Sequence, residues 1–294
     1  MENRVPVLFI AGGGRTGSTF LDTVLGNHPD VASYGELYRL PRDGWLEDGC
    51  CACGELAGSC PFWSEVRSIW QGPSGNDGLE GYVALDDRFL RMGSWGRLLV
   101  ELSRPSPALR AYMAQTLALF RAIRDVGGKT WLVDSSKFPA RAMILSRTPG
   151  IDFYVIHLVR DGRGVLWSLK KLYDPDPVPA PPSSDAALPG RGAEAPAVDR
   201  GPDRGPRSLR LAGDGRPAAV VSTWEAAQRW IRKNLAAEWL RRRLPRDRSV
   251  RVRYEDLVSD PRSALGEIGH LVNLEMGALA DALIRGEEME VGHT

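Results

Sequence analysis

One short stretch restricts the fold of this chain more than any other, the glycine-rich run "AGGGRTGSTF" at residues 11–20. It follows "VPVLFIA" (residues 5–11), whose β-branched and aromatic residues predict a buried strand. After the run, apolar residues recur at helical spacing, which predicts a helix over residues 18–26. Strand, glycine-rich turn and helix together are the context of a phosphate-binding loop.

The turn departs from the common phosphate-loop pattern G-x-x-x-x-G-K-[ST] at one position. Laid on Gly12–Thr19, both glycines and the final Thr19 fit, but Ser18 occupies the lysine position. Arg15 supplies a cation inside the loop instead, and its guanidinium can donate two hydrogen bonds to one anion. Free backbone N–H groups at a helix start favour an anion as well. The simpler interpretation is a turn that carries a surface arginine.

The rest of the chain alternates between predicted strands and helices. Strands are expected at 5–11, 130–133, 153–159 and 249–254, and helices at 18–26, 64–70, 109–125, 140–147, 164–172, 223–243, 261–272 and 275–285. This alternation predicts an α/β fold, a P-loop-like three-layer sandwich with a central parallel sheet flanked by helices. Residues 174–216 are rich in Pro and Gly and lack periodicity, so we expect one domain over residues 1–294 with a flexible insertion there.

Composition excludes several classes of protein. The chain has 294 residues, 43% of them hydrophobic, and a net charge of +1, so it can bury a full core. Near-neutral charge predicts no general binding to nucleic acid. We find neither a signal peptide nor an apolar run of membrane-spanning length. We therefore expect a cytoplasmic location and no membrane association.

A second stretch, "VIHLVRDGRGVLWSL" (residues 155–169), has a strand that ends before Arg160. Ser168 follows eight residues later, about one turn into the next predicted helix. An arginine and a hydroxyl placed in this way can hold a second phosphate. Taken alone, a surface ion pair between Arg160 and Asp161 explains the pattern equally well.

Together the two stretches resemble the cofactor signatures of the sulfotransferases that use 3′-phosphoadenosine 5′-phosphosulfate (PAPS). In that family the 5′-phosphosulfate loop carries its basic residue early, like Arg15, and an arginine followed eight residues later by a serine holds the 3′-phosphate, like Arg160 and Ser168. Further similarity lies in "NHPDVASYGEL" (27–37), "CCACGELAGSCPFW" (50–63), "VDSSKFPAR" (133–141) and "VRYEDLVSDP" (252–261). The resemblance covers most of the chain outside residues 174–216.

The resemblance implies a PAPS-dependent sulfotransferase that moves a sulfuryl group to a hydroxyl or amine of a small-molecule or carbohydrate acceptor. PAPS is then the co-substrate and no metal is required. A homodimer stays open. A phosphosulfate is shorter than a triphosphate, which accounts for the missing lysine at position 18. The implied cofactor-binding residues are Gly14, Arg15, Thr16, Gly17, Ser18, Thr19, Arg160, Ser168 and Tyr254.

Four residues are candidates for catalysis. Glu36, in "YGEL", stands where related sulfotransferases carry a glutamate and could take the acceptor proton. His28 is the alternative base, although its place after the first helix also suits a packing role. The resemblance implies that Lys137, in "SSKFP", contacts the transferring group, and Arg15 would neutralise the departing phosphate. Lys137 could otherwise be a surface lysine near a helix start.

All four cysteines of the chain lie within eleven residues, as Cys50, Cys51, Cys53 and Cys60. Their spacing lacks the paired C-x-x-C units of a well-formed zinc site, so we expect no metal. The resemblance to the sulfotransferases implies that this segment is a structured loop near the acceptor cleft. The printed sequence ends at "EMEVGHT", where the family usually continues into a segment that closes over the 3′-phosphate. We expect either a shortened sequence or another closing element.

Two other functions stay open at this stage. A P-loop kinase of a small molecule or nucleoside would share the first strand, loop and helix, but it requires a loop lysine and a Mg²⁺-binding carboxylate, for which Asp134 is the only suitable candidate. A nucleotide-binding protein without catalysis would not depend on Glu36 or Lys137.

Overall fold

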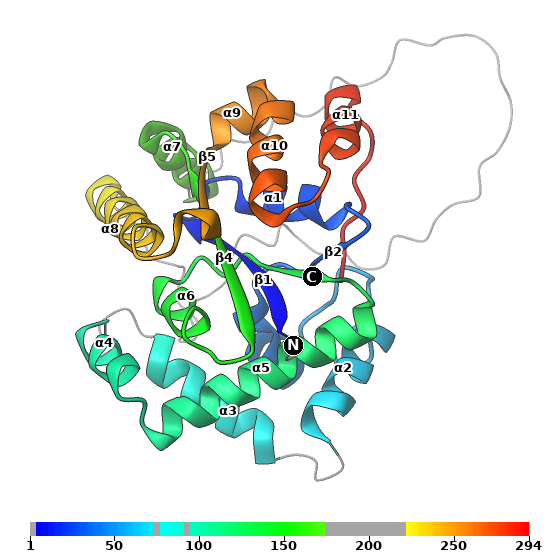
Figure 1. Ribbon diagram of the computed structural model, residues 1–294, viewed down its shortest axis with the longest axis vertical. Coiled ribbons are helices and arrows are strands. Elements are labelled where there is room, and N and C mark those ends of the chain that lie inside the picture. The colour runs from blue at the N-terminus through cyan, green and yellow to red at the C-terminus, as the bar shows by residue number, and fades with distance from the viewer. Residues whose placement is uncertain (1–3, 73–76, 91–94, 174–221, 294) are drawn as a thin grey trace, which may run out of the picture.

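The computed structural model describes residues 4–72, 77–90, 95–173 and 222–293 (Figure 1). In these ranges, five parallel strands form one sheet in the order β2-β3-β1-β4-β5. The strands are β1 (Val5–Gly12), β2 (Val31–Ser33), β3 (Trp131–Asp134), β4 (Ile151–Val159) and β5 (Ser249–Arg253). The expected insertion at 174–216 lies outside the described residues.

Helices connect and cover the strands. They are α1 (Ser18–Gly26), α2 (Pro61–Gln71), α3 (Asp77–Leu90), α4 (Trp95–Ser103), α5 (Pro107–Gly127), α6 (Pro139–Leu145), α7 (Gly162–Tyr173), α8 (Thr223–Arg241), α9 (Tyr254–Ser259), α10 (Pro261–Val272) and α11 (Gly277–Arg285). Short 3₁₀ turns lie at Leu37–Arg39 and Arg246–Arg248, and one π-helical segment lies at Leu40–Leu46. In the described part of the chain, no helix is long and apolar enough to span a bilayer.

Strand β1 divides the core into two layers, because successive side chains of a strand point to opposite faces of the sheet. Val5, Val7 and Phe9 pack with residues of α2, α5 and α6, whereas Leu8 and Ile10 pack with residues of α1, α10 and α11. Figure 1 shows these two groups of helices on opposite sides of the sheet. The predicted α/β fold, with a central parallel sheet between helical layers, is confirmed.

The topology places a crevice at the carboxyl ends of β1 and β4. These two strands are neighbours, but α1 leads from β1 toward the β2 edge, whereas the chain after β4 leads to β5 at the opposite edge. Connections that leave neighbouring strands in opposite directions create a switch point, where α/β proteins bind their ligands. Both sequence signatures, after β1 and after β4, therefore lie at this point.

Candidate functional site

The glycine-rich loop joins β1 to α1 and is tightly closed. Thr16 is buried and its Oγ1 donates a hydrogen bond to the carbonyl oxygen of Gly13 (2.9 Å). Gly17 has a φ of 88° and lies under Tyr254, the first residue of α9; a Cβ on Gly17 would stand 2.2 Å from a Tyr254 ring carbon. Only glycine fits there, both sterically and conformationally. The loop thus brings backbone and an aromatic ring together at the switch point.

The two arginine signatures meet in this structure. The Arg15 Nε–H donates a hydrogen bond to Ser168 Oγ on α7 (2.9 Å), and Arg160 Nη1 donates to the Arg15 carbonyl oxygen (3.1 Å). The Arg160 guanidinium also lies 4.4 Å from the centre of the Tyr254 ring, a cation–π contact. Residues separated by about 150 positions in the chain therefore form one cationic group.

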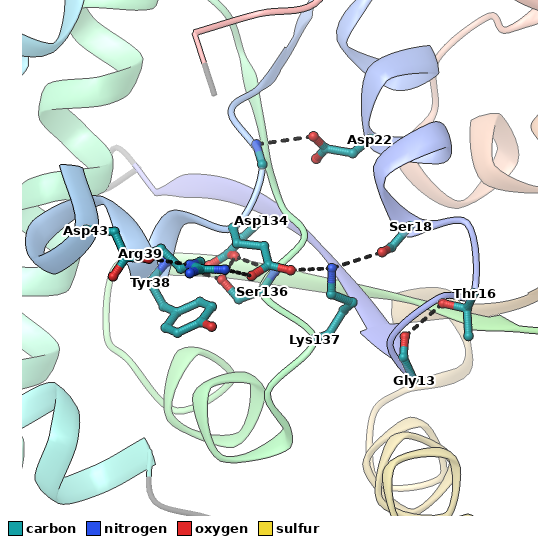
Figure 2. Close-up of polar contacts among 12 residues, drawn as sticks. Gly13, Thr16, Ser18, Asp22, Tyr38, Arg39, Asp43, Asp134, Ser136 and Lys137 are labelled. Carbon is teal, nitrogen blue, oxygen red and sulfur yellow. Dashed lines mark hydrogen bonds and ion pairs between the residues drawn. The ribbon is translucent and has the colours of Figure 1, made fainter. Parts of the chain in front are cut away.

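A second charged group lies beside the first, at the carboxyl end of β3. The Lys137 ammonium donates a hydrogen bond to Ser18 Oγ (3.0 Å; Figure 2) and forms an ion pair with Glu36 Oε1 (2.5 Å). Both side chains are largely shielded, with 12% of Lys137 and 28% of Glu36 exposed. Ser18, in the position of the missing loop lysine, thus accepts a hydrogen bond from a lysine in the connection between β3 and α6.

Backbone strain marks the same residues. Arg15 and Lys137 have φ values of 64° and 62°, and they are two of the four non-glycine residues with positive φ in the described ranges. A side chain in this conformation costs about 1–3 kcal/mol, so it persists where the surroundings impose it. Strain of this kind gathers at functional sites.

A buried ion pair supports Lys137 and the segment that carries Glu36. The carboxylate of Asp134, fully buried at the end of β3, accepts hydrogen bonds from the Arg141 guanidinium (2.7 Å) and from the Ser136 backbone N–H (3.0 Å). The Ser136 hydroxyl donates to the same carboxylate and accepts from the Tyr38 backbone N–H (3.3 Å; Figure 2). Arg141 is 1% exposed. The Asp134–Arg141 pair therefore fixes the chain on both sides of the Lys137–Glu36 contact.

Asp22, on α1, holds the other end of the Glu36 segment. Its Oδ2 accepts a hydrogen bond from the Gly35 backbone N–H (3.1 Å), the residue before Glu36. Burial raises the pKa of the Asp22 carboxyl to about 6, and hydrogen bonds from Ser33 and Gly35 offset only part of this effect. Asp22 is outside the set of residues that the sequence pattern singled out.

These groups line one pocket of about 510 Å³. Of the residues expected to bind cofactor, seven line it: Gly14, Arg15, Gly17, Ser18, Thr19, Arg160 and Ser168. Glu36 and Lys137 line it too. The Thr16 side chain is buried within the loop, and Tyr254 packs against Gly17 and Arg160. The pocket is thus cationic on one side and carries a carboxylate on the other.

Sequence reasoning missed one pocket lysine. Lys233, on α8, lines the pocket and its ammonium lies 5.6 Å from the centre of the Phe138 ring. Burial lowers the pKa of Lys233, and the nearby Lys137 adds to this effect. Helix α8 was expected from its sequence, but nothing in the local pattern indicates which of its faces meets the sheet end.

The structure separates His28 from this pocket. His28 is buried after α1, where its Nδ1 accepts a hydrogen bond from the Asp30 backbone N–H (3.1 Å) and its Nε2 lies 3.3 Å from the Glu275 carbonyl oxygen. Both ring nitrogens thus have backbone partners. His28 is not among the pocket residues, whereas Glu36 is.

No protein-family model matches the chain, and no curated protein sequence matches it significantly. Among solved structures, the sulfotransferase domain of the curacin biosynthetic pathway aligns with 18% identity, covering 98% of this chain and 81% of that one, with a TM-score of 0.47. The sulfotransferase domain of the Synechococcus PCC 7002 olefin synthase gives 20% identity, coverage of 95% and 77%, and a TM-score of 0.45. A sulfotransferase of Mycobacterium tuberculosis H37Rv aligns with 14% identity, covering 98% of this chain and 73% of that one, with a TM-score of 0.48. The chain is therefore similar to bacterial sulfotransferases at a distance, and the assignment of a function depends on the site itself.

Proposed function

We propose that this protein is a sulfotransferase that moves a sulfuryl group from PAPS to a hydroxyl or amine of a small-molecule or carbohydrate acceptor. The observation that carries the proposal is the junction of Arg15, Arg160 and Ser168 at one end of the pocket. Each signature alone is compatible with a surface arginine. Two signatures that converge on one pocket provide cations for two separate anionic groups on a single ligand.

The pocket residues fit a donor with a phosphosulfate and a second phosphate. The loop from Gly14 to Thr19 begins α1, so its backbone N–H groups and helix dipole favour an anion. Arg160 and Ser168 can hold the further phosphate, and the Tyr254 ring supports the Arg160 guanidinium through their cation–π contact. Such a donor supplies an activated sulfuryl group whose leaving group is a phosphate.

The opposite side of the pocket fits the acceptor. We assign to Glu36 the removal of the proton from the acceptor O–H or N–H, because it is the carboxylate among the pocket residues. The acceptor atom then bonds to sulfur while the bond from sulfur to the bridging oxygen breaks, and the electron pair stays on the departing phosphate. We assign to Lys137 and Arg15, which line the pocket, the neutralisation of that charge.

A kinase is less compatible with the site. Phosphoryl transfer from ATP uses a carboxylate on Mg²⁺. Asp134, the candidate at the sequence level, has its oxygens engaged by Arg141 and Ser136 in a fully buried position. A carboxylate already paired in this way is not free to bind a metal.

The test is ligand stabilisation with a matched pair of variants. We expect 3′-phosphoadenosine 5′-phosphate to raise the Tm more than AMP or ATP with Mg²⁺, and Arg160→Ala to remove this advantage. Arg163→Ala is the control, since Arg163 lies three residues further on, pairs with Asp161 and is 92% exposed. If ATP with Mg²⁺ or AMP stabilises the wild-type chain as much as 3′-phosphoadenosine 5′-phosphate does, the proposal is contradicted. Transfer of labelled sulfate to a panel of alcohols, phenols, amines and sugars then identifies the acceptor class.

A further inference from the structure

Four potential metal ligands meet outside the pocket. The thiols of Cys51, Cys53 and Cys60 and a ring nitrogen of His293 all lie within 4.8 Å of one another. Cys53 Sγ is 3.6 Å from Cys60 Sγ, and His293 Nδ1 is 3.5 Å from the Sγ atoms of both Cys51 and Cys60. The three cysteines come from one loop, residues 50–60, and the histidine comes from the far end of the described chain.

The three separations given above match the edges of a zinc tetrahedron. With Zn–S near 2.3 Å and Zn–N near 2.0–2.1 Å, tetrahedral geometry places two sulfurs about 3.8 Å apart and a sulfur and nitrogen about 3.6 Å apart. The observed values of 3.6 Å and 3.5 Å agree with both edges. Sulfur and imidazole ligands select zinc over Mg²⁺ or Ca²⁺, which prefer oxygen.

The loop backbone is shaped to present the thiols together. Cys50 and Leu56 form an antiparallel bridge, and the Cys51 backbone N–H donates to the Glu55 carbonyl oxygen (2.8 Å). Between them the chain turns at Gly54, whose φ is 96° and whose N–H donates to the Cys51 carbonyl oxygen (3.0 Å). This turn allows Cys51 and Cys53, which are separated by one residue, to point their sulfurs to the same centre.

His293 is positioned by contacts that do not involve the cysteines. Its ring stacks on Phe62 of α2, with centres 4.9 Å apart and planes inclined by 7°. The preceding segment is held by two hydrogen bonds between Asn27 and the Glu290 backbone, each 3.0 Å. Gly292 passes so close to the Ser33 carbonyl oxygen that a Cβ would stand 2.6 Å from it. Independent packing thus brings the fourth ligand to the three thiols.

We propose that Cys51, Cys53, Cys60 and His293 bind one zinc ion that joins the loop at residues 50–60 to the C-terminal segment. Four protein ligands fill a tetrahedron, so the site is structural rather than catalytic. It stands independently of the sulfotransferase proposal. It also departs from the expectation of no metal, which considered only the cysteine spacing; the fourth ligand lies 233 residues beyond Cys60.

The zinc site lies outside the pocket, but its histidine is linked by packing to the segment that carries Glu36. Phe62, which stacks on His293, also stacks on Tyr34 at 4.9 Å, and Tyr34 is two residues before Glu36. Cys60 is the N-cap residue immediately before α2, and α2 packs in the core beside α5. A metal here therefore stabilises the end of the loop, the start of a core helix and the C-terminal segment together.

The experiment measures metal in the full chain, purified under reducing conditions without added chelator. We expect about one zinc per chain in the wild type and in Cys50→Ser, and less than about a tenth of that in Cys53→Ser and His293→Ala. Cys50 is the matched control, because it is exposed, lies in the same loop and is outside the cluster. Cys53 is also exposed, so its replacement should leave the fold intact.

Cobalt gives a second readout that is independent of folding yield. Co²⁺ added to the zinc-free wild type should give thiolate charge-transfer absorption and the visible bands of a tetrahedral site, and these should change in His293→Ala. A chelator should lower the Tm of the wild type and leave that of Cys53→Ser unchanged. The proposal is overturned by a wild type that binds neither metal, by equal zinc loss in Cys50→Ser and Cys53→Ser, or by a Cys53–Cys60 disulfide in the reduced preparation.

Discussion

The two halves of the pocket differ in how they are supported. Arg15 and Arg160 lie on two loops at the pocket edge, and we call them the arginine side. Glu36 and Lys137 lie against a buried ion pair. Arg15 is exposed and its contacts are single hydrogen bonds to other pocket groups. Behind Lys137 lie Asp134 and Arg141, with 0% and 1% of their side chains exposed. The arginine side can therefore be altered with little effect on folding. Changes behind Lys137 alter the fold and the site together.

The largest effect is expected from Glu36→Gln, which keeps the size and polarity of the side chain but removes its basicity. Loss of a general base costs about 10²- to 10⁴-fold in rate, so transfer should fall by that factor while the Tm and the binding of 3′-phosphoadenosine 5′-phosphate stay near wild type. Single-turnover transfer to an acceptor found by screening measures this. His28→Ala is the comparison. If its transfer falls further than that of Glu36→Gln with the fold intact, the base is misassigned.

The next effect concerns stability. Arg141→Met leaves the Asp134 carboxylate buried without its guanidinium, and breaking such a pair costs about 3–5 kcal/mol of unfolding free energy. Arg248→Met is the control, because its pair with Asp152 has 31% and 26% of the side chains exposed and should contribute about 1 kcal/mol or less. Urea unfolding measures both. Similar losses for the two variants would mean that burial does not distinguish the pairs.

Sequence alone predicted the arginine side of the pocket better than the side behind Lys137. The loop and helix α1 follow from local pattern, since glycine positions and apolar spacing act within about twenty residues, and α1 covers the expected residues 18–26. Glu36 and Lys137 were also singled out, although only as residues similar to those of a family. That Lys137 reaches Ser18 depends on β3 lying beside β1, which no local pattern contains.

The misses have similar causes. Strand β2 has three residues, too few to show alternation, and α3 contains two glycines that weaken a helical prediction. The local sequence around Arg141 does not distinguish it from an exposed arginine on a helix. Only the packing of α3, α5 and α6 buries it. His293 could be linked to the cysteines only through the path of the whole chain. Long-range packing, not propensity, decides these positions.

Asp22 links the two sides of the pocket, because it belongs to α1, the helix after the glycine-rich loop, but its carboxyl supports the segment that carries Glu36. Its pKa rises from 3.8 to about 6 on folding, so between these values the folded state holds a proton that the unfolded state has lost. The free energy of unfolding should therefore fall by about 3 kcal/mol as the pH rises from about 4 to about 6, and it should stay lower above pH 6. Asp22→Asn cannot ionise and can still accept from Gly35, so its stability should lack this fall. The urea unfolding midpoint of both chains is measured across this pH range. If it changes with pH to the same extent in the wild type and in Asp22→Asn, Asp22 is not the cause.

The smallest effect that still decides a role is expected at Arg15. Arg15→Ala removes a charge-assisted contact to the departing phosphate and should slow transfer more than tenfold, which corresponds to at least about 1.4 kcal/mol of transition-state stabilisation. Arg15→Lys should recover only part of the rate, because an ammonium cannot reproduce the two-pronged guanidinium contact.

Since Arg15 is exposed and its Nε bonds only to Ser168 Oγ within the described residues, both variants should unfold at nearly the wild-type urea concentration. Steady-state rates with saturating donor, measured beside urea midpoints, separate the two quantities. A wild-type rate in Arg15→Ala would remove the loop arginine from the reaction, and a large loss of stability would show that the arginine side, too, supports the fold.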